Sequence, residues 1–537
     1  MPSRTADRAF LATLRRPRGL RATLPVVLPV VLPVVILLAA LLAAAATRAD
    51  ESPAPLAGSG PYNLTIFHTN DTHSAFLPRA AEWSKDGRLA GGVLALAHYL
   101  ELERRTAPAS LLVDAGDFMT GNPVCNLKED GVPGVAIAKM MNALGYDCGL
   151  VGNHEFDIGL PDLEKLAKKF DYPLLAADIV DAGGKAVFRD TPVEITRGGV
   201  RIGIMGVSCG GMTEVVAPSR FAGLAMAAQL PILRRQAREL DPKTDLLVVL
   251  SHDGVEGDRA LADSLAGSGI DVIVGGHSHT RLKEPELRGG ILIVQAGSAM
   301  TNLGRLDLRV ANDRVEGYAG QLVTLWADSL AATGKLAETV QGYADQVQKQ
   351  YGRVLGTLAG DLRRGKGENT LGDWIADVIR EAAQADVAVL NGGGIRRDLP
   401  AGPLTALLVH EVLPFANTLV TVKMTGAEVQ SMADCNARGQ VGGDHGILQV
   451  SGISYVVVPG AGGAPATAGE VTVGGKPLDP ARDYVVAMPD FVAMMAPVYL
   501  GREIPPFTDL GRELSKVVCD AVEKAGTVQV PAGGRLR

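Results

Sequence analysis

Residues 150–159 read LVGNHEFDIG, an apolar run that ends in polar side chains. The first two residues are typical of a buried strand, yet Asn153, His154 and Asp157 follow almost at once. Polar groups at the end of a buried strand need hydrogen-bond partners or a ligand. A turn with a helix N-cap would explain this motif if it stood alone. The other motifs of the first half of the chain must decide between these readings.

Four further apolar runs end in the same kinds of residue. They are 64–67 before Asp71 and His73, 110–113 before Asp114 and Asp117, 246–250 before His252, and 272–274 before His277 and His279. Helix-like stretches at 90–105 and 134–146 lie between such runs, as in an α/β layered domain. Because the carboxyl ends of strands in such folds meet at one rim, we expect these residues to form one site. Five of the nine histidines lie at these strand ends, which a structural role for each would not explain.

The side-chain types point to metal ions. Imidazoles mixed with carboxylates and an amide oxygen suit divalent Zn, Mn, Fe or Co. One tetrahedral ion cannot use so many ligands, whereas two ions about 3.5–4 Å apart, bridged by a carboxylate and a water, can. Such a pair makes a bridging hydroxide available near neutral pH and offsets the charge of a phosphoryl group. The strand ends therefore predict a di-metal site for phosphate-ester hydrolysis.

These motifs resemble those of a known family. "HTNDTH" (68–73), "GD" (116–117), "GNHEFD" (152–157), "SHDG" (251–254) and "GGHSH" (275–279) are similar to the motif series of calcineurin-like metallophosphoesterases, specifically the two-domain 5′-nucleotidases. That group includes UDP-sugar hydrolases and 2′,3′-cyclic-nucleotide phosphodiesterases. "ENTLGDWIAD" (368–377), "NGGGIR" (391–396) and "VLPFANTLV" (412–420) resemble its C-terminal domain. The resemblance implies an α/β fold: a four-layer α/β/β/α metallophosphoesterase domain, a connecting helix, and a smaller α/β (α+β) substrate-binding domain.

The resemblance also implies a role for each residue of the motifs. One metal would be held by Asp71, His73 and His279, the other by Asn153, His252 and His277, with Asp117 bridging them. His154 would donate a hydrogen bond to the phosphoryl oxygens or the leaving group, and Asp157 would orient it and keep it cationic.

The second domain would bind the substrate. By the resemblance, Asn391 would contact the base or ribose, and Phe491 would stack on the base. The glycines around Gly393 let the backbone approach a ligand closely, and Arg396 can grip a phosphate with its planar fork. A glycine-rich turn with a solvated arginine is the simpler reading of this motif when it stands alone.

The chain departs from the family in its specificity residues. Ile447 and Val450 stand where we expect a second stacking aromatic, and "MMAPVYLG" (494–501) replaces a "GGDG" loop and its Asp. Gly365 stands where a phosphate-binding arginine is expected, with Lys366 beside it. Because stacking on one ring contributes roughly 1–3 kcal/mol, we expect weaker recognition of nucleosides.

The N-terminus and the composition set the domain plan. Arginines precede an apolar run at 24–46, which predicts an export signal at 1–49, although an uncleaved membrane anchor would also fit. We expect a flexible leader at 50–61, a metallophosphoesterase domain at 62–325, a linker helix at 326–352 and a C-terminal domain at 353–530. The signal predicts a periplasmic or secreted protein.

Charge and cysteine content narrow the possible partners. Without residues 1–49, the chain has 45 basic and 58 acidic residues, a net charge of −13, so a nucleic-acid polymer is not an expected partner. Its five cysteines allow one disulfide but are more typical of buried thiols. We expect a small phosphate ester, first a 5′-nucleotide, as the substrate. The alternatives are a cyclic-nucleotide or UDP-sugar phosphodiesterase, a hydrolase of non-nucleotide or sulfur oxyanion esters, and a non-catalytic nucleotide-binding or adhesion protein.

Overall fold

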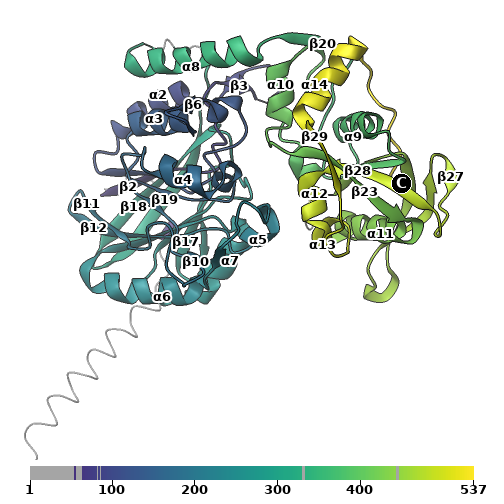
Figure 1. Cartoon of the computed structure of the whole chain (residues 1–537). Coiled ribbons are helices and arrows are strands. Elements are labelled where there is room, and N and C mark those ends of the chain that lie inside the picture. The colour runs from purple at the N-terminus through teal and green to yellow at the C-terminus, as the bar shows by residue number, and fades with distance from the viewer. Residues whose placement is uncertain are drawn as a thin grey trace, which may run out of the picture. The chain divides into compact units, whose positions relative to one another are not determined.

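Two β-sheets dominate the N-terminal half of the computed structural model, which describes residues 54–55, 63–81, 83–84, 86–328, 330, 333–442 and 447–537 (Figure 1). The seven-stranded sheet has the order β1 (Ala54–Pro55), β19 (Arg314–Thr324), β18 (Asn302–Ala311), β2 (Leu64–Thr69), β5 (Ser110–Asp114), β8 (Cys148–Leu150) and β9 (Leu174–Leu175). The six-stranded sheet has the order β11 (Val193–Arg197), β12 (Val200–Val207), β14 (Leu246–Ser251), β15 (Val272–Val274), β17 (Ile291–Val294) and β16 (Glu286–Arg288).

Helices and short ribbons surround these sheets. The helices are α2 (Val93–Arg104), α3 (Val135–Leu144), α4 (Leu160–Ala167), α5 (Met212–Val215), α6 (Gln229–Leu240) and α7 (Gly254–Ser264), with 3₁₀ turns η2 (Pro123–Asn126), η3 (His154–Ile158) and η4 (Asp241–Lys243). The ribbons pair β3 (Arg79–Ala80) with β4 (Leu89–Ala90), β6 (Lys128–Glu129) with β7 (Val132–Pro133), and β10 (Ile179–Asp181) with β13 (Leu224–Met226).

The apolar clusters define four layers. Leu64 and Ile66 of β2 join a cluster with Ile202 of β12, so the two sheets pack face to face. Phe67, on the opposite face of β2, packs in a second cluster with Leu96 of α2. A third cluster joins the outer face of the six-stranded sheet to α6 and α7, and Figure 1 shows α2 and α3 on one side of the sheets and α6 on the other. Strands buried on both faces read as continuous apolar runs, which explains the sequence pattern.

The five apolar runs singled out in the sequence all form strands. They correspond to β2, β5, β8, β14 and β15. β2 pairs in parallel with β5, and β5 with β8, while β14 pairs in parallel with β15. Their carboxyl ends therefore share one rim, as expected for an α/β fold.

The C-terminal half is built around a mixed five-stranded sheet. Its order is β24 (Leu448–Ser451), β21 (Val387–Asn391), β28 (Asp483–Pro489), β23 (Thr418–Thr425) and β29 (Thr508–Glu513). Two three-stranded sheets consist of β22 (Gly402–Thr405), β20 (Val354–Leu358) and β30 (Thr527–Val528), and of β25 (Ile453–Val458), β26 (Thr467–Val473) and β27 (Lys476–Pro477). The helices are α9 (Thr370–Ala383), α10 (Ala406–Val412), α11 (Gly426–Gly442), α12 (Asp490–Met494), α13 (Ala496–Tyr499) and α14 (Leu514–Ala525), with 3₁₀ turns η5 (Gly392–Gly394) and η6 (Ala461–Gly463).

The segments around the two halves add detail to the expected plan. Helix α8 (Lys335–Tyr351) lies within the segment expected to link the halves. The chain end also packs on the C-terminal half, because Arg535 Nη2 donates to Asp377 Oδ2 at 2.7 Å. The expected export signal at 1–49 lies outside the described residues, and of the expected leader the structure describes only β1, which pairs with β19.

Two further expectations concern cysteines and membranes. All five cysteines have free thiols, and four of them are buried, as small core side chains. In the part of the chain that the structure describes, we find no helix long and apolar enough to cross a membrane.

Candidate active site

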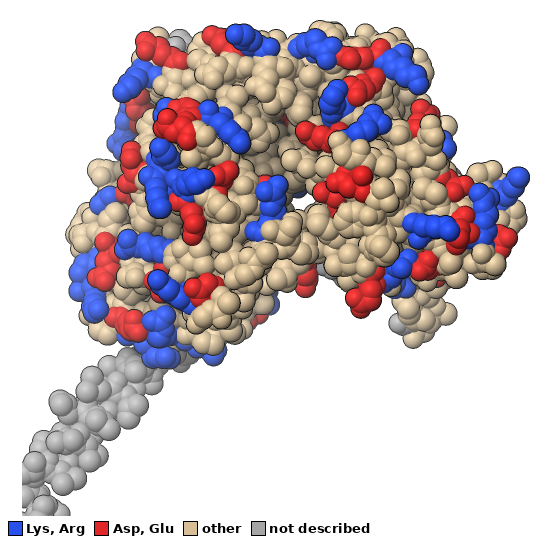
Figure 2. All heavy atoms as spheres, viewed as in Figure 1, with Lys and Arg blue, Asp and Glu red and all other residues tan. Residues whose placement is uncertain are grey.

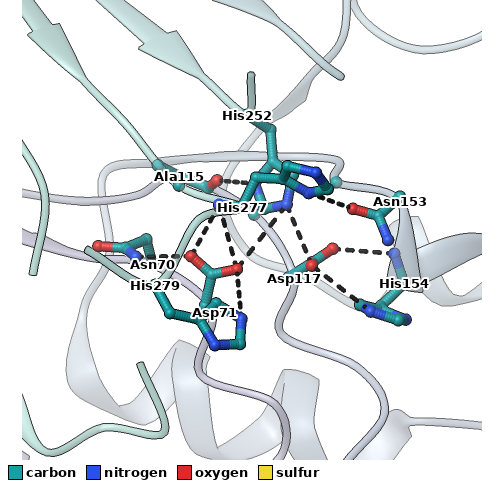
Figure 3. A network of polar contacts seen from close by, with 12 residues as sticks. Asn70, Asp71, Ala115, Asp117, Asn153, His154, His252, His277 and His279 are labelled. Carbon is teal, nitrogen blue, oxygen red and sulfur yellow. Dashed lines mark hydrogen bonds and ion pairs between the residues drawn. The ribbon is translucent and has the colours of Figure 1, made fainter. Parts of the chain in front are cut away.

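The strand-end residues come together at the shared rim (Figure 3). Two groups of residues stand out, and within each group the ligand atoms all lie within 4.8 Å of one another. They are Asp71, His73 and His279, and Asp117, His252 and His277. The residues that distant motifs supply therefore converge as the sequence predicts.

The backbone at these positions is unusual. Asp71, His73, Asp117, His277 and His279 all have positive φ, between 47° and 71°. For residues other than glycine this left-handed conformation is uncommon and costs about 1–3 kcal/mol each. Surrounding structure must hold these residues in place, and such strain is concentrated at functional sites.

In the first group, nitrogen and oxygen atoms face a common point. His73 Nε2 lies 3.0 Å from His279 Nε2, which is 3.3 Å from Asp71 Oδ1. His73 Nδ1 lies 3.2 Å from the Met119 carbonyl, and donation to that carbonyl leaves Nε2 with its lone pair. Burial opposes ionisation of Asp71, but His279 and His252 together outweigh it and lower the pKa of Asp71 to about 2. The first group thus places an ionised carboxylate beside the ring nitrogens of two histidines.

The second group has the same character. His252 Nδ1 donates to the Ala115 carbonyl at 2.6 Å, and its Nε2 points at Asp117 Oδ2, 3.0 Å away. His277 Nδ1 lies 2.9 Å from Asn153 Oδ1, so Asn153 joins this group. Burial disfavours a charged imidazole, yet Asp117 and Asp71 outweigh it and raise the pKa of His252 to about 10. The carboxylates therefore favour positive charge at this position.

The donor set fits two divalent cations. A neutral His252 would aim its lone pair at a carboxylate oxygen, which is favourable only with a cation between them. The first group likewise aims two ring nitrogens at each other. Asp71 Oδ1 is 3.9 Å from His252 Nε2, so the groups adjoin. Mixed imidazole and carboxylate ligands suit Zn, Mn, Fe or Co.

His154 lies beside the groups without belonging to either. Its Nδ1 is 2.8 Å from Asp157 Oδ2, and its Nε2 is 4.0 Å from Asp117 Oδ2. Thr120 Oγ1 donates to the same Asp157 oxygen at 2.7 Å. Burial alone would lower the pKa of His154, but Asp117 and Asp157 outweigh it and raise the pKa above its usual value. The pair places a histidine side chain, whose charged form the two carboxylates favour, at the edge of the candidate metal site.

Glu155 connects the loop that contains Asp117 with the loop that contains Asn153. Its fully buried carboxylate accepts from the backbone N–H of Asp117 at 3.0 Å, of Met119 at 3.0 Å and of Gly152 at 2.6 Å. A Cβ on Gly152 would meet Asp117 Oδ1 at 2.4 Å, so this close approach requires glycine. Glu155 therefore serves local hydrogen bonding and holds the two loops in place.

The C-terminal half reaches this site through Arg396. Arg396 Nη2 lies 3.1 Å from His73 Nε2. The guanidinium also stands 5.9 Å from the ring centre of Phe415, whose ring is 5.5 Å from that of His154. A cavity of about 800 Å³ adjoins these groups, and its lining includes His279, Gly393 and Arg396. Arg396 can therefore meet an anion held at the candidate metal site.

The other predicted substrate residues lie farther along the C-terminal half. The part of this cavity's lining that the structure describes does not include Asn391 or Phe491. Asn391 is buried, with an Oδ1 that has no hydrogen-bond partner among the described residues. The Phe491 ring lies 6.1 Å from that of Tyr499 at an angle of 62°. These side chains form a second group of aromatic and polar residues, apart from the described lining of the cavity.

The aromatic that we missed in the sequence is Phe415. Ile447 and Val450 are buried near β24, and Val450 belongs to an apolar core cluster. Phe415 precedes β23, whose Leu419 pairs with Pro489, so its segment runs beside that of Phe491. Its position in the loop "LPFAN", just before an apolar strand, is the sequence signal that could have identified it.

Basic residues near Gly365 differ in where they point. Gly365, Arg364 and Lys366 line the cavity. Arg363 instead pairs with Asp361 at 2.7 Å and lies outside the described lining. On the face shown in Figure 2, Lys and Arg side chains are interspersed with Asp and Glu. Lys366 and Arg396 thus place positive charge at this cavity.

Comparisons with known proteins agree with this architecture. Residues 64–281 match the calcineurin-like phosphoesterase family, and residues 354–499 match the 5′-nucleotidase C-terminal domain. The chain is 28% identical over 519 residues to the protein UshA of Yersinia enterocolitica, covering 86% of this chain and 91% of that protein. It is also 28% identical over 529 residues to a 5′-nucleotidase of Vibrio cholerae, covering 88% and 93%.

A solved structure gives the same result. The fold matches that of a 5′-nucleotidase precursor from Thermus thermophilus with a TM-score of 0.79 and 27% identity, over 88% of this chain and 99% of the other. Both halves thus have relatives that join them in the same order. The chain belongs to the two-domain 5′-nucleotidase family, in which a calcineurin-like phosphoesterase domain precedes a 5′-nucleotidase C-terminal domain.

Proposed function

We propose that the protein is an exported di-metal phosphohydrolase that releases phosphate from 5′-nucleotides. The observation that supports this most directly is the adjacent position of two His/Asp groups, beside the His154–Asp157 pair. A structural metal site would not need that pair. The family and its relatives support hydrolysis of phosphate esters.

Different residues would bind the metal ions, bind the phosphate and donate to the leaving group. Asp71, His73 and His279 would hold one ion, and Asn153, His252 and His277 the other, with Asp117 between them. When bound, the ions supply an activated water and offset phosphoryl charge. Arg396 would bind the phosphate oxygens and orient the ester. His154, oriented by Asp157, would donate a proton or hydrogen bond to the departing oxygen.

The substrate class can be tested by phosphate release. The purified protein, loaded with Mn²⁺ or Zn²⁺, would be assayed with AMP, UDP-glucose, 2′,3′-cyclic AMP and p-nitrophenyl phosphate. We expect AMP to be hydrolysed with the highest kcat/KM. Turnover of p-nitrophenyl phosphate but not of AMP would show that the natural substrate is not a nucleotide. If the metal-loaded protein turned over none of the four esters, the proposed hydrolase activity would be refuted.

Arg396→Ala should raise KM for AMP by about 10- to 100-fold, because a hydrogen bond to a charged group contributes about 1.5–3 kcal/mol. Steady-state kinetics would measure the change. Arg363→Ala is the matched control, since that arginine is exposed and pairs with Asp361. Equal KM values for the Arg396 variant and the wild type would exclude Arg396 from substrate binding.

Thr120→Val should lower kcat for AMP by about fivefold, since a hydrogen bond contributes near 1 kcal/mol and this one fixes Asp157. Valine keeps the branched shape, so packing is preserved. Thr120→Ser restores the hydroxyl and should recover most of the activity. A serine variant as slow as the valine variant would show that the hydroxyl is not the important group.

A further inference from the structure

Gln295 stands where a polar residue ends an apolar strand, as at the five motifs of the candidate site. It follows β17 directly, and its side chain is fully buried. β17 pairs in parallel with β15, with Val294 opposite Val274. The loop that follows β15 contains His277 and His279. Gln295 therefore lies beside the loop that supplies one histidine to each candidate metal group.

The side chain of Gln295 binds this loop at three points. Its Nε2 donates to the Gly276 carbonyl at 3.0 Å. Its Oε1 accepts from Ser278 Oγ at 3.0 Å and from the Thr280 N–H at 2.5 Å. The three contacts lie before His277, between the two histidines, and after His279. One amide thus spans the whole segment.

The loop needs such support. His277 and His279 have φ of 71° and 55°, a conformation that persists only where neighbouring structure holds it. A buried amide that makes all these bonds fixes the backbone on both sides of each histidine. Partners of metal ligands that do not touch the metal commonly set ligand orientation in this way.

We infer that Gln295 is a positioning residue that sets the separation of His277 and His279, and with it the separation of the two metal ions. This inference rests on the proposed function, because it assumes that both groups bind metal. Gln295 touches neither substrate nor metal in this account. Its effect would pass through the two histidines.

Gln295→Met tests the inference, because methionine has similar length but cannot make these hydrogen bonds. The full-length protein would be titrated with Mn²⁺. The readouts are metal bound per chain, the exchange-coupled electron paramagnetic resonance spectrum, which depends on the separation of the ions, and kcat and KM for p-nitrophenyl phosphate. We expect the affinity for the second Mn²⁺ to fall by about 10- to 100-fold, with an altered coupled spectrum and a lower kcat at similar KM.

Gln236→Met is the matched control. Gln236 is also buried, on α6, and its Nε2 donates to the Asp190 carbonyl at 2.6 Å. The control should bind two Mn²⁺ ions as the wild type does. Wild-type affinity and an unchanged coupled spectrum in Gln295→Met would overturn the inference, as would an equal loss in both variants. A wild-type protein that binds no pair of ions would instead refute the proposed function.

Discussion

His154→Ala should lower kcat for AMP by about 10²–10⁴-fold, the usual contribution of a positioned acid or base. The ring lies 4.0 Å from Asp117 Oδ2 and is fixed by Asp157 at 2.8 Å, so it faces the site without belonging to either ligand group. Its removal should therefore leave the bound metal unchanged. Steady-state kinetics and metal analysis of the same preparation would measure both effects.

The dependence on leaving group sharpens this prediction. A nucleoside leaves as a basic alkoxide that needs a proton, whereas p-nitrophenolate leaves without one. The His154→Ala defect should thus be larger with AMP than with p-nitrophenyl phosphate. His98→Ala, an exposed histidine on α2, serves as the control and should retain full activity. Equal defects with both esters would argue against proton donation by His154.

Asp117→Asn should abolish tight binding of a second ion and lower kcat by more than about 100-fold. Loss of an outer partner of a metal ligand already costs about 10- to 100-fold, and Asp117 would be a direct ligand. Asp117 Oδ2 lies 3.0 Å from His252 Nε2, and its Oδ1 accepts from the His154 N–H at 2.8 Å. The change removes the negative charge between the groups while keeping the side-chain shape.

Metal analysis after dialysis and kinetics would measure this effect. Asp178→Asn is the control, because Asp178 is also fully buried and accepts a backbone N–H, from Ser208 at 2.8 Å. It should lose stability without losing a metal ion. An Asp117→Asn protein that keeps two ions and full kcat would contradict the bridging role.

The layered fold of the first half was predictable because its strands are buried on both faces. Runs such as 246–250 stand out from the amphipathic helices, and polar residues mark their carboxyl ends. The same signal is present at Gln295, after the run at 291–294, but Gln295 lies outside the motifs that carry the family resemblance. Its role became visible only from the loop that it touches.

The C-terminal site was harder to read. Its residues come from loops between short strands, where no periodicity ties one residue to another. Phe415 and Phe491 are 76 positions apart, and the pairing of β23 with β28 places their segments at the same end of the sheet. Sequence spacing cannot give that register, so the sequence alone could not place Phe415 relative to Phe491.

The most direct test of the account is a crystal structure of the protein grown with Mn²⁺, with anomalous scattering measured at the manganese edge. We predict two peaks about 3.5–4 Å apart, one at Asp71, His73 and His279 and one at Asn153, His252 and His277. Asp117 should lie between them, and His154 should contact neither. A single peak, or peaks away from these residues, would contradict the di-metal site.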